Sequence, residues 1–140
     1  MLNLTELANE LQEITAWQET PVLLGQDDYL RVVVRALRTF FRDINHPAEY
    51  SPSLFIETED GLCYDREFQI DEEEYILILC RIEFFQRVQT DVNNSFGYST
   101  DALTVTNADK PYANLKNTLE DLQHERRICF NKMVRYTFGE

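Results

Sequence analysis

The chain has 140 residues, a mass of 16.6 kDa and 44% hydrophobic residues, which fits one domain of roughly 100–200 residues with a buried core. Thirteen Lys and Arg against twenty-five Asp and Glu leave a net charge of −12. This charge argues against non-specific binding to nucleic acid or to an anionic membrane, since both depend on cationic side chains.

The N-terminal residues predict a helix over residues 3–14, because apolar side chains recur every three or four positions. Asn3 is the expected N-cap and Glu6 completes the pair of a capping box. No basic region followed by an apolar core is visible here, so we expect no signal peptide. The longest apolar run, Tyr75–Cys80, is far shorter than the ~20 residues that span a bilayer. We therefore expect a soluble, intracellular protein without a membrane segment.

Asp27 and Asp28 place negative charge at the start of a second predicted helix, which runs to about Ile44. One face of this helix is apolar. The other face carries an arginine stripe whose members are spaced by four, three and four residues: Arg31, Arg35, Arg38 and Arg42. Prolines at positions 47 and 52 exclude a continuation of the helix.

The segment 53–68 predicts a β-hairpin. Apolar residues flank Glu59-Asp60-Gly61, and an Asp-Gly loop of two residues matches the twist of paired strands. Because an isolated hairpin is marginally stable in water, we expect it to pack on the helices or on another chain.

A third helix is predicted from Asp71, which as N-cap would place Glu74 at the third helical position. Ile70 and Tyr75 would then form a hydrophobic staple. The apolar run that follows predicts a central, buried helix. Asn93, Asn94 and Gly97 predict its end, and β-branched residues over 102–106 predict a short strand.

The last helix is predicted to start at Asn107–Pro111 and to continue to Tyr136. Its heptad-like seam is apolar except at Arg126. The seam consists of Tyr112, Leu115, Leu119, Leu122, Arg126, Cys129, Met133 and Tyr136.

These elements predict a mainly α fold: a bundle of about four helices with a long C-terminal helix, a small β-hairpin and a short extra strand. We expect one domain over 1–140, with a helical core of about 3–44 and 71–136 and a hairpin insertion of about 53–68.

The sequence predicts neither a catalytic site nor a metal or cofactor site. The acidic residues of 71–74 are explained by a helix start, and His46 and His124 have no partner at ligand spacing. Three cysteines without a CxxC pair predict reduced thiols. No phosphate loop, nucleophile elbow or zinc-protease motif occurs, so we do not expect an enzyme.

Charge is segregated along the chain. Between Asp43 and Glu74 lie eleven acidic residues and one basic residue, Arg66, directly after the arginine stripe. Three interpretations remain open. The charges are solvated, they pair within the chain, or the stripe of one subunit meets the acidic hairpin of the next.

The stretch from Phe68 through the aliphatic run to Phe84-Phe85 resembles the central helix of tailed-bacteriophage head–tail connector proteins, the adaptor or head-completion family. An aromatic-x-aliphatic segment, an acidic cap, a long aliphatic run and paired aromatics carry the resemblance. A polar loop, a strand-like segment over 96–106 and a long helix over 109–136 follow in the same order. The resemblance covers about residues 68–136.

This resemblance implies a structural virion protein, located at the head–tail interface and in the host cytoplasm during assembly. It implies a ring, commonly of twelve subunits, that docks on the portal protein and contacts a neighbouring tail or stopper protein. DNA would pass nearby without specific binding. The implied portal contacts are Arg126, Arg127, Lys132, Arg135, Tyr136 and Phe138.

Subunit contacts would involve the arginine stripe and an inserted strand. That strand would be Leu103, Thr104, Val105 and Thr106. The acidic surface beside the DNA channel would be Glu57, Glu59, Asp60, Asp65 and Glu67, and its charge would keep the passing duplex from adhering. Two alternatives remain: a small acidic DNA mimic that inhibits a DNA-handling protein, and a dimeric helical regulatory protein that pairs through the C-terminal seam.

Overall fold

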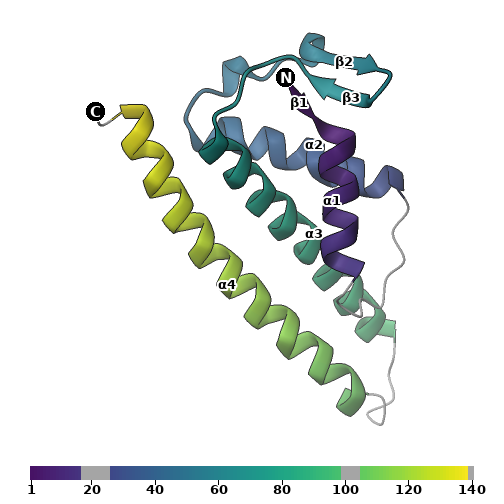
Figure 1. Cartoon of the computed structure of the whole chain (residues 1–140). Helices are drawn as coiled ribbons and strands as arrows, with labels where there is room; N and C mark the ends of the chain where they lie inside the picture. The colour runs from purple at the N-terminus through teal and green to yellow at the C-terminus, as the bar shows by residue number, and fades with distance from the viewer. Residues whose placement is uncertain (17–25, 99–104, 139–140) are drawn as a thin grey trace.

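The computed structural model describes residues 1–16, 26–98 and 105–138 (Figure 1). It confirms the expected mainly α fold, in which four helices accompany a small three-stranded sheet. In chain order the elements are β1 (Leu2–Asn3), α1 (Leu4–Ala16), α2 (Gln26–Asp43), the 3-10 helices η1 (Pro47–Glu49) and η2 (Pro52–Leu54), β2 (Phe55–Thr58), β3 (Gly61–Tyr64), α3 (Ile70–Tyr98) and α4 (Val105–Phe138).

Helix α1 starts as the sequence predicts. The Oδ1 atom of Asn3 accepts a hydrogen bond from the backbone N–H of Glu6 at 3.0 Å, so Asn3 is the N-cap. The apolar face then buries Leu4, Leu7 and Leu11 in the common core.

Helices α2 and α3 contribute most of the core. Val33, Leu37 and the pair Phe40 and Phe41 are fully buried, while Tyr29 stacks on Phe84 of α3 with ring centroids 5.4 Å apart. The ring of Phe40 lies 6.2 Å from that of Tyr75. Aromatic pairs therefore join α2 to α3 near the start of α2, at Tyr29, and near its end, at Phe40.

The start of α3 differs from the prediction. The helix begins at Ile70, and the backbone N–H of Gln69 donates to the Glu72 carboxylate at 2.9 Å, so the cap lies two residues before Asp71. The expected staple is also wrong, since Ile70 is 75% exposed whereas Tyr75 is buried.

The predicted end of α3 is wrong as well, because Asn93, Asn94 and Gly97 all lie inside the helix. Asn and Gly disfavour a helix by only about 0.7–1 kcal/mol each, which is too little to stop one with a packing partner. Figure 1 shows that partner: α4 runs antiparallel beside α3.

Helix α4 begins at Val105, earlier than the sequence predicts, and over 34 residues it is roughly 51 Å long. The described part of its seam faces the interior of the same chain, since Leu122, Cys129 and Met133 belong to the core that α2 and α3 build. Phe130 packs on Tyr75, with ring centroids 5.9 Å apart.

The sheet has the order β1-β3-β2 and is antiparallel throughout. It confirms the hairpin, but the loop consists of Glu59 and Asp60, because Thr58 pairs with Gly61. The expected Asp60-Gly61 loop is therefore shifted by one residue. Gly61 follows the turn and has a φ of +124°. Residues other than glycine rarely adopt this backbone conformation.

The extra strand is also not the predicted one. Val105 and Thr106 form the first turn of α4, and residues 99–104, which include Leu103 and Thr104, lie outside the described part. The third strand is instead β1, where Leu2 pairs with Tyr64. In the part of the chain that the structure describes, no helix is long and apolar enough to cross a membrane.

Candidate interaction surfaces

The arginine stripe lies on the surface of α2. All four guanidinium groups are exposed, whereas the opposite side of the same helix is buried. Within the described residues none of the four forms an ion pair, and Arg38 lies 5.5 Å from the ring of Tyr50 in a cation–π contact. The helix period that the sequence predicts therefore places four unneutralised positive charges along one face.

The acidic hairpin surface has the opposite charge. Its members are exposed and consist of Glu57, Glu59, Asp60, Asp65 and Glu67. Only Glu67 lies near a cation among the described residues, 3.6 Å from the N-terminal amine, and it is itself 98% exposed. Strand β2 forms the edge of the sheet, so its outer side has no strand partner in the described sheet.

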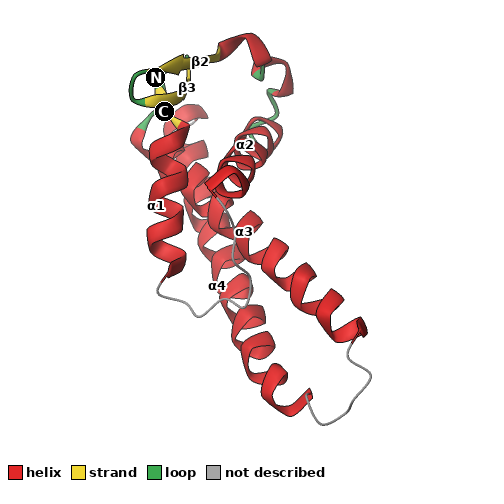
Figure 2. Ribbon diagram, turned by 90° about the vertical axis from the view of Figure 1, so that its right-hand side faces the viewer, coloured by secondary structure: helices red, strands yellow, loops and turns green. Residues whose placement is uncertain are grey.

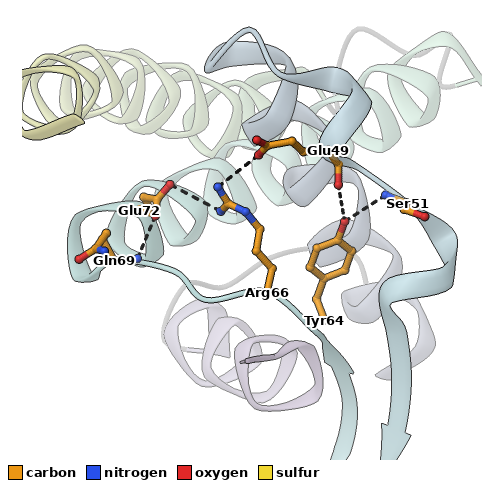
Figure 3. Close-up of polar contacts among 6 residues, drawn as sticks. All are labelled: Glu49, Ser51, Tyr64, Arg66, Gln69 and Glu72. Carbon is orange, nitrogen blue, oxygen red and sulfur yellow. Dashed lines mark hydrogen bonds and ion pairs between the residues drawn. The ribbon is translucent and has the colours of Figure 1, made fainter. Parts of the chain in front are cut away.

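Two side chains, Tyr64 and Arg66, make the polar contacts that attach the hairpin to the rest of the chain (Figure 3). The Tyr64 hydroxyl accepts from the backbone N–H of Ser51 at 3.0 Å and donates to the carbonyl of Glu49 at 3.1 Å. The Arg66 guanidinium lies 3.3 Å from the Glu49 carboxylate and 3.6 Å from that of Glu72.

Arg66 also covers aromatic rings, which explains why the one basic residue of the acidic segment lies here. Its guanidinium lies 4.7 Å from the ring of Phe68, 5.2 Å from Phe41 and 5.8 Å from Phe40. The hairpin therefore has a fixed attachment, and its acidic surface is held in place relative to α2 and α3.

A groove of about 940 Å³ lies between α2 and α3. Half-buried Leu30 and Val34 line it together with Arg31 and Arg35 of the stripe. The remaining charged groups around it are Asp27, Glu83 and Arg87, of which Arg87 pairs with Asp28 at 3.2 Å. The α2 wall therefore combines apolar side chains with two arginines and one acid, Asp27, and neither arginine forms an ion pair among the described residues.

A polar cluster inside the bundle joins three helices. The Tyr75 hydroxyl and the Arg126 guanidinium both donate to Oδ2 of Asp43, and Nε of Arg126 donates to the Tyr75 hydroxyl at 3.3 Å. Burial, reinforced by the hydrogen bond to Asp43, raises the pKa of Tyr75. Burial alone would lower the pKa of Arg126, but its hydrogen bonds to Tyr75 and Asp43 outweigh this and raise it.

The predicted portal contacts on α4 divide into three groups. Arg127 and Lys132 are exposed, as a contact surface requires. Arg126 is instead engaged by Asp43 and Tyr75 inside the chain. The side chains of Arg135, Tyr136 and Phe138 lie outside the described part.

The structure brings no catalytic constellation together from the residues considered. His46 and His124 are exposed on separate elements, and Cys63, Cys80 and Cys129 are buried free thiols. Burial raises the pKa of Cys80 and of Cys129, with nearby acidic groups adding to the effect. In the described ranges, no three His, Cys, Asp or Glu side chains are placed to hold a metal ion.

Sequence reasoning found both charged surfaces but missed the groove and the polar cluster. The sequence contains one signal for the cluster: Arg126 lies in the otherwise apolar seam of α4. A charged group in such a position requires a partner, because burying an unpaired charge is costly. Its partner Asp43 is 83 residues away, so the sequence could not indicate which acid that is.

No protein-family model, curated protein or solved structure matches the chain.

Proposed function

We propose that the protein is a structural subunit of the head–tail connector type, which docks on a phage portal and forms a ring around the DNA path. The observation that carries this proposal is the pair of exposed, oppositely charged surfaces, the arginine stripe and the acidic hairpin surface. Within the described residues the stripe has no ion-pair partner, and the hairpin acids have only the N-terminal amine near Glu67.

The placement of these surfaces favours contact between subunits. Figure 2 shows the hairpin at the upper end of the bundle, above α1, with α2 beside α1. Two complementary surfaces that consist of different residues of one subunit make a heterologous contact, which generates a ring when the rotation closes. A solvated face remains the simplest competitor, since exposed ion pairs are each worth ~0–1 kcal/mol.

We assign the portal contact to Arg127 and Lys132, which are exposed on α4, and to Arg135, Tyr136 and Phe138, which follow them in the sequence. The DNA path is assigned to the acids of the hairpin surface outside its loop, Glu57, Asp65 and Glu67. A net charge of −12 per subunit would repel the phosphate backbone and let the duplex move without adhering.

The deciding experiment is native mass spectrometry of the protein alone and mixed with portal rings. We expect several copies to bind each portal ring, whether the free protein is monomeric or not. A protein that stays unbound at high excess, or one that binds a DNA-handling enzyme as a strict dimer, would contradict the connector proposal. The second outcome would support an acidic DNA mimic.

The role of the acidic surface needs a separate experiment. Glu57→Lys combined with Asp65→Lys should slow DNA ejection from assembled particles, because a cationic path would retain the duplex. A matched variant with Lys at Glu13 and Glu120, both exposed and away from the hairpin, should eject normally. Equal ejection rates for the two variants would contradict the proposed role of the acidic surface in DNA passage.

Of the alternatives, the DNA mimic leaves the arginine stripe without a use, since a phosphate mimic requires only acidic groups. The dimeric regulator would pair through the α4 seam. The described part of that seam is already packed inside the chain, through Leu122, Cys129 and Met133. The connector proposal uses both charged surfaces and leaves the seam in place.

A further inference from the structure

The groove between α2 and α3 combines apolar side chains with charged groups that form no ion pair among the described residues. Its volume of about 940 Å³ is enough for several side chains of a partner. Leu30 and Val34 remain only half-buried there, at the edge of the apolar face of α2 and next to Arg31 and Arg35.

This lining defines the chemistry of an occupant. Apolar side chains would complete the burial of Leu30 and Val34, which the fold leaves unfinished. Carboxylates would neutralise Arg31 and Arg35, which have no acidic partner within the described residues. An occupant that is apolar at one point and acidic next to it therefore fits the α2 wall.

The hairpin of the same sequence has this composition. Ile56 of β2 is 37% exposed, one of few large apolar side chains at the surface. The two loop residues that follow on the strand, Glu59 and Asp60, are exposed acids without an ion-pair partner in the described chain. Strand β2 is also the sheet edge, so the hairpin end projects with free main-chain groups on one side.

The hairpin is held away from the groove of its own chain. The Arg66 and Tyr64 contacts attach it to the segment before β2 and to the start of α3, at the end of the bundle where the N-terminus lies (Figures 1 and 3). The groove is lined by the N-terminal half of α2, between Asp27 and Arg35, and by the middle of α3. A second copy is thus required to bring the two together.

We propose that the hairpin of one copy docks in the α2–α3 groove of the next copy. Ile56 packs on Leu30 and Val34, and Glu59 and Asp60 pair with Arg31 and Arg35. This inference deepens the proposed ring assembly and rests on it, because it names the surface through which neighbouring subunits join. The contact is heterologous, so it extends beyond a dimer.

The first experiment is site-specific cross-linking. Variants Ile56→Cys and Leu30→Cys are mixed at high concentration, alone and on portal rings, and oxidised. We expect a disulfide-linked species in the mixture that neither variant forms alone. The matched control pairs Ile56→Cys with Ile128→Cys, an exposed position on α4, and should not cross-link.

The second experiment exchanges the charges. Arg31→Glu with Arg35→Glu should weaken self-association about tenfold, measured by sedimentation velocity, and Glu59→Lys with Asp60→Lys should do the same. A chain carrying all four changes should regain association with itself. The control compares Lys116→Glu, an exposed position on α4, with Arg31→Glu alone: both make the same charge change, and Lys116→Glu should leave self-association unchanged.

The possible failures are distinguishable. If rings form on the portal but the cross-link and the charge effect are absent, this docking mode is wrong and the connector proposal stands. If the cross-link forms but no portal binds, the docking stands and the connector proposal fails. A protein that forms neither contact, even on the portal, overturns the docking as well.

Discussion

Arg126 interrupts an apolar seam, and its surroundings explain how the bundle tolerates a cation there. Asp43 and Arg126 retain exposed fractions of 19% and 27%, so solvent screens part of their attraction. The Tyr75 hydroxyl lies between them and uses both its donor and an acceptor site. One cluster thus links the end of α2, the first turns of α3 and the middle of α4.

Replacing Arg126 by Met should lower the free energy of unfolding by about 1–3 kcal/mol, measured by urea denaturation. The loss arises because the Asp43 carboxylate would be left with only the Tyr75 hydroxyl as a donor. Arg127→Met, at the exposed neighbouring position, should change stability by less than about 0.5 kcal/mol. Equal effects of the two substitutions would mean that the cluster contributes no stability.

Tyr75 and Cys80 make the folded state sensitive to alkali. Burial raises both pKa values above the ordinary 10.0 of a phenol and 9.0 of a thiol. In the unfolded chain both groups lose their protons near those ordinary values, whereas the folded chain retains them. Their contribution to stability is therefore complete below about pH 9 and is lost as the pH rises further.

Urea titrations between pH 7 and 11 should therefore show a stable plateau and then a decline, to which each group adds up to about 1.4 kcal/mol per pH unit. Cys80→Ala should be less stable at pH 7 because of the cavity, yet its decline above pH 9 should be shallower. An identical decline in both proteins would exclude Cys80 as a cause.

At the scale of elements, the attachment of the hairpin to α1 depends on one glycine. A Cβ atom at Gly61 would lie 2.5 Å from Oγ1 of Thr5, whose hydroxyl accepts the backbone N–H of Leu62 at 2.9 Å. The φ of +124° adds a conformational penalty. We expect Gly61→Ala to cost about 2 kcal/mol or more.

Circular dichroism and thermal unfolding would measure this cost. Glu59→Ala, in the same loop but exposed, should leave the melting temperature nearly unchanged. Thr5→Gly combined with Gly61→Ala should cost less than the sum of the two single variants, because the new Cβ would no longer meet the Cβ and Oγ1 atoms of Thr5. A double variant whose cost equals that sum would place the cost of Gly61→Ala in backbone strain alone.

The elements that the sequence predicts well are those with a long internal period. Side-chain spacing alone predicts helices α1 and α2 and the arginine stripe, because apolar residues that recur every three or four positions define one face of a helix. Strand β1 could not be predicted, since two residues carry no period and their pairing with β3 depends on contacts some sixty positions away. The boundary errors at α3 and α4 arise where packing between helices outweighs weak local signals such as Asn93 and Gly97.

The candidate surfaces likewise divide into those that local spacing predicts and those that depend on tertiary packing. Spacing predicts which residues share a face, so the cationic and acidic surfaces were visible in the sequence. The groove depends on how α2 and α3 lie beside each other, and Leu30 and Glu83 are joined only by the tertiary fold. Such a site requires the structure before its chemistry can be argued.

For the whole molecule, the net charge and the local charges act in opposite directions on self-association. Two subunits of −12 repel each other over long distances, whereas the hairpin acids and the stripe arginines attract at contact. Salt screens the two effects differently, because the Debye length is about 30 Å at 0.01 M and about 10 Å at 0.1 M.

Self-association should therefore strengthen as salt rises from about 0.01 to 0.1 M, where long-range repulsion is removed, and weaken towards 1 M, where contact pairs are screened as well. Sedimentation velocity across this range would measure it. The variant with Arg31→Glu and Arg35→Glu should lose the weakening at high salt, since its groove no longer attracts carboxylates. A wild-type protein whose association only strengthens with salt would show that apolar contact, rather than charge complementarity, joins the subunits.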